Sequence, residues 1–276
     1  VCSSDLTPYR AKRKVTVFGS ARTLPEAEEY RQAVEFGKAA VARGFMVITG
    51  GGEGIMGAAQ RGAGRENSFG LNIRLPFEQE PNEEIAGDSK LINFKYFFTR
   101  KLCFMKESDA LALFPGGFGT HDEGFEALTL IQTGKSQPKP VVFIDRPRGT
   151  YWKTWWRFVE DQLLDRGLIS RDDLALFKVT DDIGEACDEI VNFYRNYHSS
   201  RYLKDQLVLR VKRPVSDSLL ATLNERFSDI CVNGEKFQAA TGNGDDEHTG
   251  LHRIAFPFNR SAYGRLRMVI DVINQH

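Results

Sequence analysis

Short apolar runs alternate with amphipathic stretches along the first two thirds of the chain. The runs are rich in β-branched and aromatic residues and most stop near glycine or proline, as buried parallel strands do. The predicted strands cover residues 15–18, 45–49, 70–75, 91–96, 110–114 and 141–144. Helical spacing predicts helices over 25–44, 56–63, 99–106, 123–132, 152–164 and 183–197. This order predicts an α/β fold with a Rossmann-like, doubly wound parallel sheet.

The pattern changes near residue 200. A polar segment over 197–204 is interpreted as a link, and the chain then follows the order β-α-β-β-α, over 206–211, 217–231, 236–241, 251–256 and 261–273. We therefore predict a Rossmann-like domain over 1–199 and a small appended α+β domain over 200–276. Three glycines and three consecutive acids predict an exposed, mobile loop over 241–250.

Charge and composition exclude several classes of protein. Lys+Arg and Asp+Glu are equal at 37 each, so no general positive field attracts nucleic acid or an anionic membrane. No apolar run approaches the ~20 residues of a membrane-spanning helix, and no basic-then-apolar secretion signal is seen, so we expect a cytoplasmic protein. The scattered cysteines form no CxxC pair, which argues against disulfides and structural zinc.

Three glycine-containing turns follow predicted strands and precede predicted helices, at 19–22, 50–54 and 115–120. Glycine lets backbone amides approach an anion, and a helix N-terminus adds free N–H groups, so such turns suit phosphate. Any parallel sheet also needs tight turns, so one alone would indicate little. Neither GxGxxG with a distant acid nor Gly-Lys-Ser/Thr occurs, which weighs against NAD binding and ATP hydrolysis.

The turn Pro115-Gly-Gly-Phe-Gly-Thr-His-Asp-Glu123 resembles the PGGxGTxxE motif of the LOG ("lonely guy") family, the cytokinin riboside 5'-monophosphate phosphoribohydrolases. Arg100-Lys101 lies at the family's distance before it, and residues 50–57 resemble the family's GGGxxGxMG turn. The resemblance covers about 15–197. Homologues are often labelled lysine decarboxylases, but nothing in the sequence suggests a pyridoxal phosphate site, and we expect no cofactor and no metal.

The resemblance implies that Arg100 and Glu123 are catalytic. It also implies a set of residues that bind the substrate's phosphate and ribose, namely Ser20, Gly51, Gly52, Lys101, Gly116, Gly117, Gly119 and Thr120. Hydrolysis at a ribose C1' passes through an oxocarbenium-like state, which a nearby carboxylate stabilises. Glu123 follows the phosphate turn by one helical turn. Arg100 either grips the phosphate or stabilises the departing base.

The implied reaction is hydrolysis of the N-glycosidic bond of a nucleoside 5'-monophosphate, such as a cytokinin riboside monophosphate or AMP, to free base and ribose 5-phosphate. The implied assembly is a homodimer or a higher homo-oligomer. The alternative is a non-catalytic nucleotide sensor or molybdenum cofactor carrier of the same superfamily, and the presence of both Arg100 and Glu123 favours the enzyme. Three features weaken the claim that cytokinin is the substrate. Short plant members carry Met where this chain has Phe104, the segment 70–82 resembles a bacterial branch of the family, and compact members lack the extra domain.

Other candidates have plainer interpretations. His121 is interpreted as a solvated turn residue rather than a proton shuttle, and His248 and His252 as part of a flexible polar tip rather than a metal site. Trp152, Trp155 and Trp156 are expected to form a helix-packing face or subunit contact. Among the aromatic residues at 94–98, one or two are expected to border a base pocket.

Overall fold

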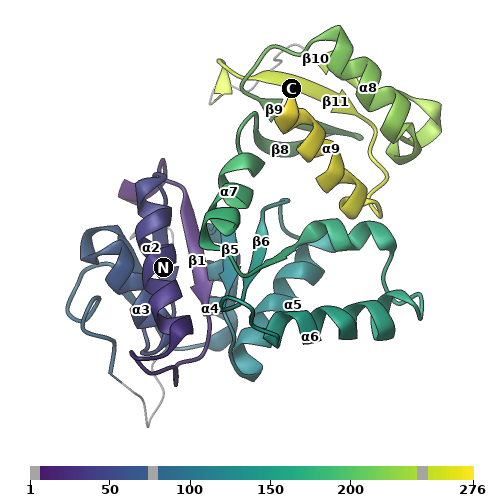
Figure 1. The fold of residues 1–276 in the computed structure, drawn as a ribbon. Helices are drawn as coiled ribbons and strands as arrows, with labels where there is room; N and C mark the ends of the chain where they lie inside the picture. The colour runs from purple at the N-terminus through teal and green to yellow at the C-terminus, as the bar shows by residue number, and fades with distance from the viewer. Residues whose placement is uncertain (1–6, 74–79, 241–247) are drawn as a thin grey trace. The chain divides into compact units, whose positions relative to one another are not determined.

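The computed structural model describes residues 7–73, 80–240 and 248–276. The chain forms two compact units (Figure 1). The first unit comprises Val1–Leu128, Lys139–Leu168 and Phe177–Ile190; the second comprises Thr129–Pro138, Ile169–Leu176 and Val191–His276. The boundary expected after residue 199 therefore falls within the second unit.

Within the described residues, the first unit contains a seven-stranded sheet of order β4-β3-β2-β1-β5-β6-β7, and each strand pair is parallel. Its strands are β1 (Lys14–Phe18), β2 (Met46–Thr49), β3 (Ser68–Ile73), β4 (Leu91–Phe94), β5 (Ala110–Leu113), β6 (Val141–Ile144) and β7 (Lys178–Thr180). The helices that alternate with them are α2 (Glu28–Ala42), α3 (Ile55–Ala63), α4 (Phe97–Glu107), α5 (Phe118–Gln132), α6 (Tyr151–Phe158) and α7 (Ile183–Phe193). The predicted α/β fold is confirmed.

Aromatic contacts show which helices cover which face of the sheet. Phe18 of β1 packs edge-on against Phe104 of α4, with ring centroids 5.0 Å apart. On the opposite face, Phe36 of α2 packs against Phe114, which follows β5, at 5.9 Å. Helices α2 and α3 approach closely because both carry glycine at their contact: a Cβ on Gly37 would lie 2.2 Å from the Ala59 carbonyl oxygen. Figure 1 shows these two helices side by side.

The central strand β1 pairs with β2 on one side and β5 on the other, in register Thr16↔Ile48 and Thr16↔Leu111. The chain builds outward from β1 to β4 and then returns to add β5 on the other side of β1. The order therefore reverses between β1 and β5. In open parallel sheets, ligands bind at such a reversal, beyond the carboxyl ends of the two strands.

In the second unit, the described residues form a four-stranded antiparallel sheet of order β10-β11-β9-β8. Its strands are β8 (Tyr197–Leu203), β9 (Gln206–Val211), β10 (Gln238–Ala240) and β11 (His252–Phe256), and its helices are α8 (Asp217–Phe227) and α9 (Tyr263–Gln275). The predicted β-α-β-β-α order is present, but the polar link expected over 197–204 is wrong. That segment is β8, whose polar residues suit a strand at the edge of a sheet. Most of the loop expected over 241–250 lies outside the described residues.

Candidate functional site

The turns after β1 and β5 meet at the point where the strand order reverses. The backbone N–H of Ser20 donates to the carbonyl of Pro115 at 3.1 Å. A Cβ on Gly116 would lie 2.1 Å from Oγ1 of Thr120 and 3.0 Å from the nitrogen of Ser20, so only glycine fits there. The structure thus brings together three predicted phosphate-site residues, Ser20, Gly116 and Thr120.

Helix α5 begins at Phe118, so the prediction that the turn extends to Thr120 and the helix starts at Glu123 is wrong. The N–H of Thr120 already donates to the Gly117 carbonyl at 3.0 Å. The low helix propensity of glycine concealed this first turn. The N–H groups of Gly117, Phe118 and Gly119 consequently lie at a helix N-terminus, where backbone donors and the helix dipole favour an anion.

Gly117 and Gly119 leave open space beside these donors. A Cβ built on either glycine would meet no atom within 4 Å among the described residues. Phe118, between them, is exposed. An anion can therefore approach the backbone of this turn closely.

The second glycine turn, at 50–54, is packed rather than open. Met56 covers it: its Sδ would lie 2.9 Å from a Cβ on Gly50, and its Cε 2.8 Å from one on Gly52. The residue that follows this turn also contacts the turn after β1, because the N–H of Ile55 donates to the Ser20 carbonyl at 3.0 Å. Gly52 is thus covered by Met56, and the carbonyls of Gly51 and Gly52 bind a buried asparagine.

That asparagine is Asn82, which the sequence did not single out. Its Nδ2 donates to the carbonyls of Gly51 at 3.0 Å and Gly52 at 2.8 Å, and to Oε1 of Gln60 at 2.7 Å. Asn82 is buried. No local signal could have identified it, because it follows Pro81 in a segment without periodicity.

Glu123 lies in the second turn of α5, buried beside an ammonium group from α4. Nζ of Lys101 lies 3.0 Å from Oε1 of Glu123, 2.8 Å from Oδ2 of Asp122 and 2.9 Å from Oε2 of Glu126. The Lys101 ammonium therefore forms ion pairs with three carboxylates.

The charges of this cluster oppose one another. Burial is the largest influence on the pKa of Glu123 and raises it above its usual range. The charge of Glu126 also raises this pKa, whereas the charges of Lys101 and Arg100 lower it. Burial lowers the pKa of Lys101, but its hydrogen bonds to Asp122, Glu126 and Glu123 together outweigh that effect, and its pKa is raised. Lys101 is therefore a permanent cation, and Glu123 is a carboxylate that gains a proton more readily than usual.

Arg100 lies next to Lys101 on α4, and its charge acts on Glu123. Its guanidinium carbon lies 5.4 Å from the ring centre of Phe97 and 5.6 Å from that of Phe104. The residue where this chain departs from short plant members, Phe104, thus packs on the predicted catalytic arginine. Tyr96 and Phe98 beside it are exposed, whereas Phe94 is buried.

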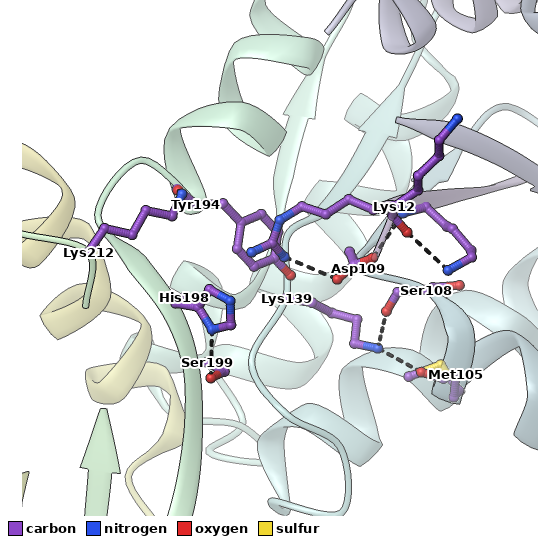
Figure 2. A network of polar contacts seen from close by, with 11 residues as sticks. Lys12, Met105, Ser108, Asp109, Lys139, Tyr194, His198, Ser199 and Lys212 are labelled. Carbon is purple, nitrogen blue, oxygen red and sulfur yellow. Dashed lines mark hydrogen bonds and ion pairs between the residues drawn. The ribbon is translucent and has the colours of Figure 1, made fainter. Parts of the chain in front are cut away.

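A buried lysine anchors the end of α4. Nζ of Lys139 donates to the carbonyls of Met105 and Ser108, each at 2.6 Å (Figure 2). Burial lowers the pKa of Lys139 to about 8. These bonds fix the helix that carries Arg100 and Lys101 against β5 and β6. No local pattern around Lys139 predicts this role.

The interpretation of His121 as a solvated turn residue is wrong. It lies within α5, half-buried, with Nε2 2.7 Å from the hydroxyl of Tyr151. Its ring contacts those of Phe125 and Trp152. The Tyr151 hydroxyl in turn donates to the Gly116 carbonyl. His121 is therefore linked to the Gly116 turn through Tyr151.

The tryptophans of α6 form the expected packing face. Trp152 and Trp155 are buried, with ring centroids 4.7 Å and 4.5 Å from that of Phe143 on β6. Phe177 contacts Trp155 and Trp156 at 5.2 Å each.

A pocket of about 310 Å³ lies beside the β1 turn and the start of α3. Its lining includes Arg22, Tyr30, Glu53, Arg61 and Asn82. Arg61 is already paired with Glu84 at 3.2 Å. None of the residues around Glu123 lines this pocket.

Two features are absent from the described residues. No group of three or more His, Cys, Asp or Glu side chains there is placed to hold a metal ion, and His248 and His252 form no such group. No helix among the same residues is long and apolar enough to cross a membrane.

Comparisons with known proteins identify relatives of this chain. A family model described as "Possible lysine decarboxylase" matches residues 56–190. A cytokinin riboside 5'-monophosphate phosphoribohydrolase of Mycobacterium tuberculosis (strain ATCC 25618 / H37Rv) is 30% identical over 172 residues, covering 60% of this chain and 87% of the relative. One from Arabidopsis thaliana is 27% identical over 161 residues, covering 57% of this chain and 72% of the relative.

Among solved structures, the molybdenum cofactor carrier protein of Chlamydomonas reinhardtii has 23% sequence identity and a TM-score of 0.46, covering 65% of this chain and 96% of that one. The decisive similarity is in sequence, because a relative 30% identical is matched along 87% of its length. The chain belongs to the LOG family.

Proposed function

We propose that this chain hydrolyses the N-glycosidic bond of a nucleoside 5'-monophosphate and releases the free base and ribose 5-phosphate. The observation that carries the proposal is that one helix, α5, supplies both the anion-binding N-terminus and the buried carboxylate of Glu123. Relatives named as cytokinin riboside 5'-monophosphate phosphoribohydrolases support the reaction. AMP and cytokinin riboside monophosphates are the substrates we propose.

The spacing along α5 suits a ribose 5-phosphate. Glu123 follows Gly119 by one turn, about 6 Å along the helix axis. Helical side chains lean toward the N-terminus, so the carboxylate reaches back over the turn that holds the phosphate. A phosphate bound at Gly117–Gly119 therefore places the sugar near Glu123.

The chemistry follows from this placement. Water attacks C1', the bond from C1' to the base nitrogen breaks with its electron pair leaving on the base, and the base takes up a proton from solvent, which balances the proton that the attacking water gives up. The Glu123 carboxylate stabilises the oxocarbenium-like state and accepts the proton of the attacking water. Lys101 favours the ionised form of that carboxylate, against the effect of its burial. Arg100 supplies a fixed positive charge for the phosphate or the departing base.

The test is release of ribose 5-phosphate from a panel of nucleoside monophosphates. Glu123→Gln is expected to lower kcat by about 10²- to 10⁴-fold, the usual contribution of a positioned acid–base group. Glu126→Gln is the matched control: it lies on the same helix and contacts the same lysine at 2.9 Å, and we expect it to retain most of the activity.

Other outcomes would contradict the proposal. Release of inorganic phosphate with the base still attached would identify a phosphatase. Nucleotide binding without hydrolysis by the wild-type chain would favour the non-catalytic sensor or carrier.

The homodimer remains part of this proposal. An apolar face on α4 that includes Phe98 and Leu102 is exposed in the single chain, next in sequence to Arg100 and Lys101. Exposed apolar patches of this kind often mark subunit contacts.

A further inference from the structure

Tyr151, the first residue of α6, reaches the phosphate turn from a neighbouring helix. Its hydroxyl donates to the Gly116 carbonyl and lies 2.7 Å from Nε2 of His121. A carbonyl oxygen only accepts, so the hydroxyl proton is committed to Gly116. His121 must then donate from Nε2. The chain of hydrogen bonds therefore runs one way, from His121 to Tyr151 to Gly116.

This series of hydrogen bonds sets the direction of the Gly117 N–H. The Gly116 carbonyl and the Gly117 N–H belong to one peptide unit, and no cis peptide occurs among the described residues. In a planar trans peptide the two groups point in opposite directions. Because Tyr151 holds the carbonyl on its own side, the Gly117 N–H faces away from Tyr151.

A glycine on each side makes this peptide easy to reorient. Glycine populates backbone conformations that other residues avoid, and Gly117 has no neighbours within 4 Å of a would-be Cβ among the described residues. A fixed orientation therefore needs an external contact, and Tyr151 provides one.

The contact is itself held rigidly. The His121 ring lies 5.5 Å from the ring of the fully buried Trp152 and 6.4 Å from that of Phe125. Tyr151 packs edge-on against Trp152 at 4.7 Å. Burial raises the pKa of the Tyr151 hydroxyl, so it stays protonated and able to donate.

We propose that Tyr151, supported by His121, is a positioning residue for phosphate: it fixes the Gly116–Gly117 peptide so that its N–H faces the 5'-phosphate of the nucleotide. The assignment rests on the proposed function, which places a phosphate at this turn. Tyr151 touches no reacting atom, so its effect falls on substrate binding rather than on the chemical step.

Tyr151→Phe tests this by removing the hydroxyl and keeping the ring. We expect KM for AMP to rise about 3- to 10-fold, as for loss of one hydrogen bond, while kcat changes less than about twofold. His121→Phe should show a smaller rise, and His121→Gln, which retains a donor, should stay nearer to wild type. The matched control is Tyr202→Phe, which removes a hydroxyl bonded to Tyr263 at 2.9 Å in the second unit and should leave KM unchanged.

A second measurement separates this inference from the proposed function. In a Glu123→Gln background, calorimetry measures AMP binding without turnover, and Tyr151→Phe should weaken it by the same factor as KM. Equal affinity with and without the hydroxyl overturns the positioning role even if the enzyme hydrolyses AMP. A parallel fall in kcat and melting temperature would also overturn it, since that indicates a merely structural bond. If AMP binds but neither the wild type nor any variant hydrolyses it, the proposed function fails. The ratio of AMP affinities with and without the Tyr151 hydroxyl still decides the role of Tyr151. Absence of AMP binding overturns both.

Discussion

The ammonium of Lys101 lies 3.0 Å from Oε1 of Glu123, and this one cation also contacts Asp122 and Glu126. Burial raises the pKa of Glu123, and the Lys101 ammonium acts in the opposite direction. In this proposal Lys101 favours the ionised form of the proposed catalytic carboxylate.

Replacing Lys101 by Gln should therefore shift the pH dependence of the reaction. Without the ammonium, burial and the charge of Glu126 raise the pKa of Glu123 further. The ionised fraction at a given pH falls, so the acidic limb of the kcat/KM profile moves to higher pH. The measurement is kcat/KM for AMP across about pH 5 to 9.

Lys178→Gln serves as the control, because it breaks an ion pair of similar length, 2.8 Å to Glu185, at the surface. Its profile should overlay that of the wild type. A Lys101→Gln profile with an unmoved acidic limb would show that Glu123 does not depend on this lysine.

In the turn at 115–120, where we propose that phosphate binds, replacing Gly116 or Gly119 by alanine should change the stability of the fold in opposite directions. At Gly116 the added Cβ would lie 2.1 Å from Oγ1 of Thr120, so Gly116→Ala should lower the melting temperature and reduce nucleotide binding. At Gly119 the Cβ has open space and the residue is helical, so Gly119→Ala should stabilise the fold by about 0.4–1 kcal/mol. The same methyl group would occupy the space where the phosphate approaches, so affinity for AMP should fall.

Thermal unfolding and AMP calorimetry on both variants check this pair. Greater stability together with weaker binding in Gly119→Ala is the distinctive result. Unchanged AMP affinity in that variant would place the phosphate elsewhere.

The features predicted correctly from sequence are those that leave a local pattern. Buried runs and glycine turns marked the parallel sheet. The family resemblance implied roles for Arg100 and Glu123, which lie on α4 and α5 and are close enough to interact electrostatically. Contacts between distant residues leave no such pattern. Asn82 bonds to a glycine 31 positions away, and Tyr151 to one 35 positions away. Strand β8 was missed because an edge strand can be polar.

Asn82 offers a test of the second glycine turn. Asn82→Ala removes the donor that satisfies the Gly51 and Gly52 carbonyls and Oε1 of Gln60. Leaving buried acceptors unsatisfied should lower the free energy of unfolding by about 1–3 kcal/mol or more. Urea denaturation measures the change, and the exposed Asn93→Ala is the control, since its hydrogen bond to Asn72 lies at the surface. Equal stability of the two variants would mean that the turn does not need Asn82.

The apolar face of α4 tests the proposed dimer. Phe98 is 86% exposed and Leu102 is 67% exposed, and their spacing of four residues places them on one side of the helix. Exposing two large apolar side chains to water is unfavourable, and a second copy of the chain would cover them. Phe98→Ser combined with Leu102→Ser should therefore convert the dimer to a monomer in size-exclusion chromatography with light scattering. Leu24→Ser, at a 61% exposed position in the segment between β1 and α2, should leave the dimer intact. A wild-type chain that is monomeric at micromolar concentration, or a double variant that stays dimeric, would remove α4 from any subunit contact.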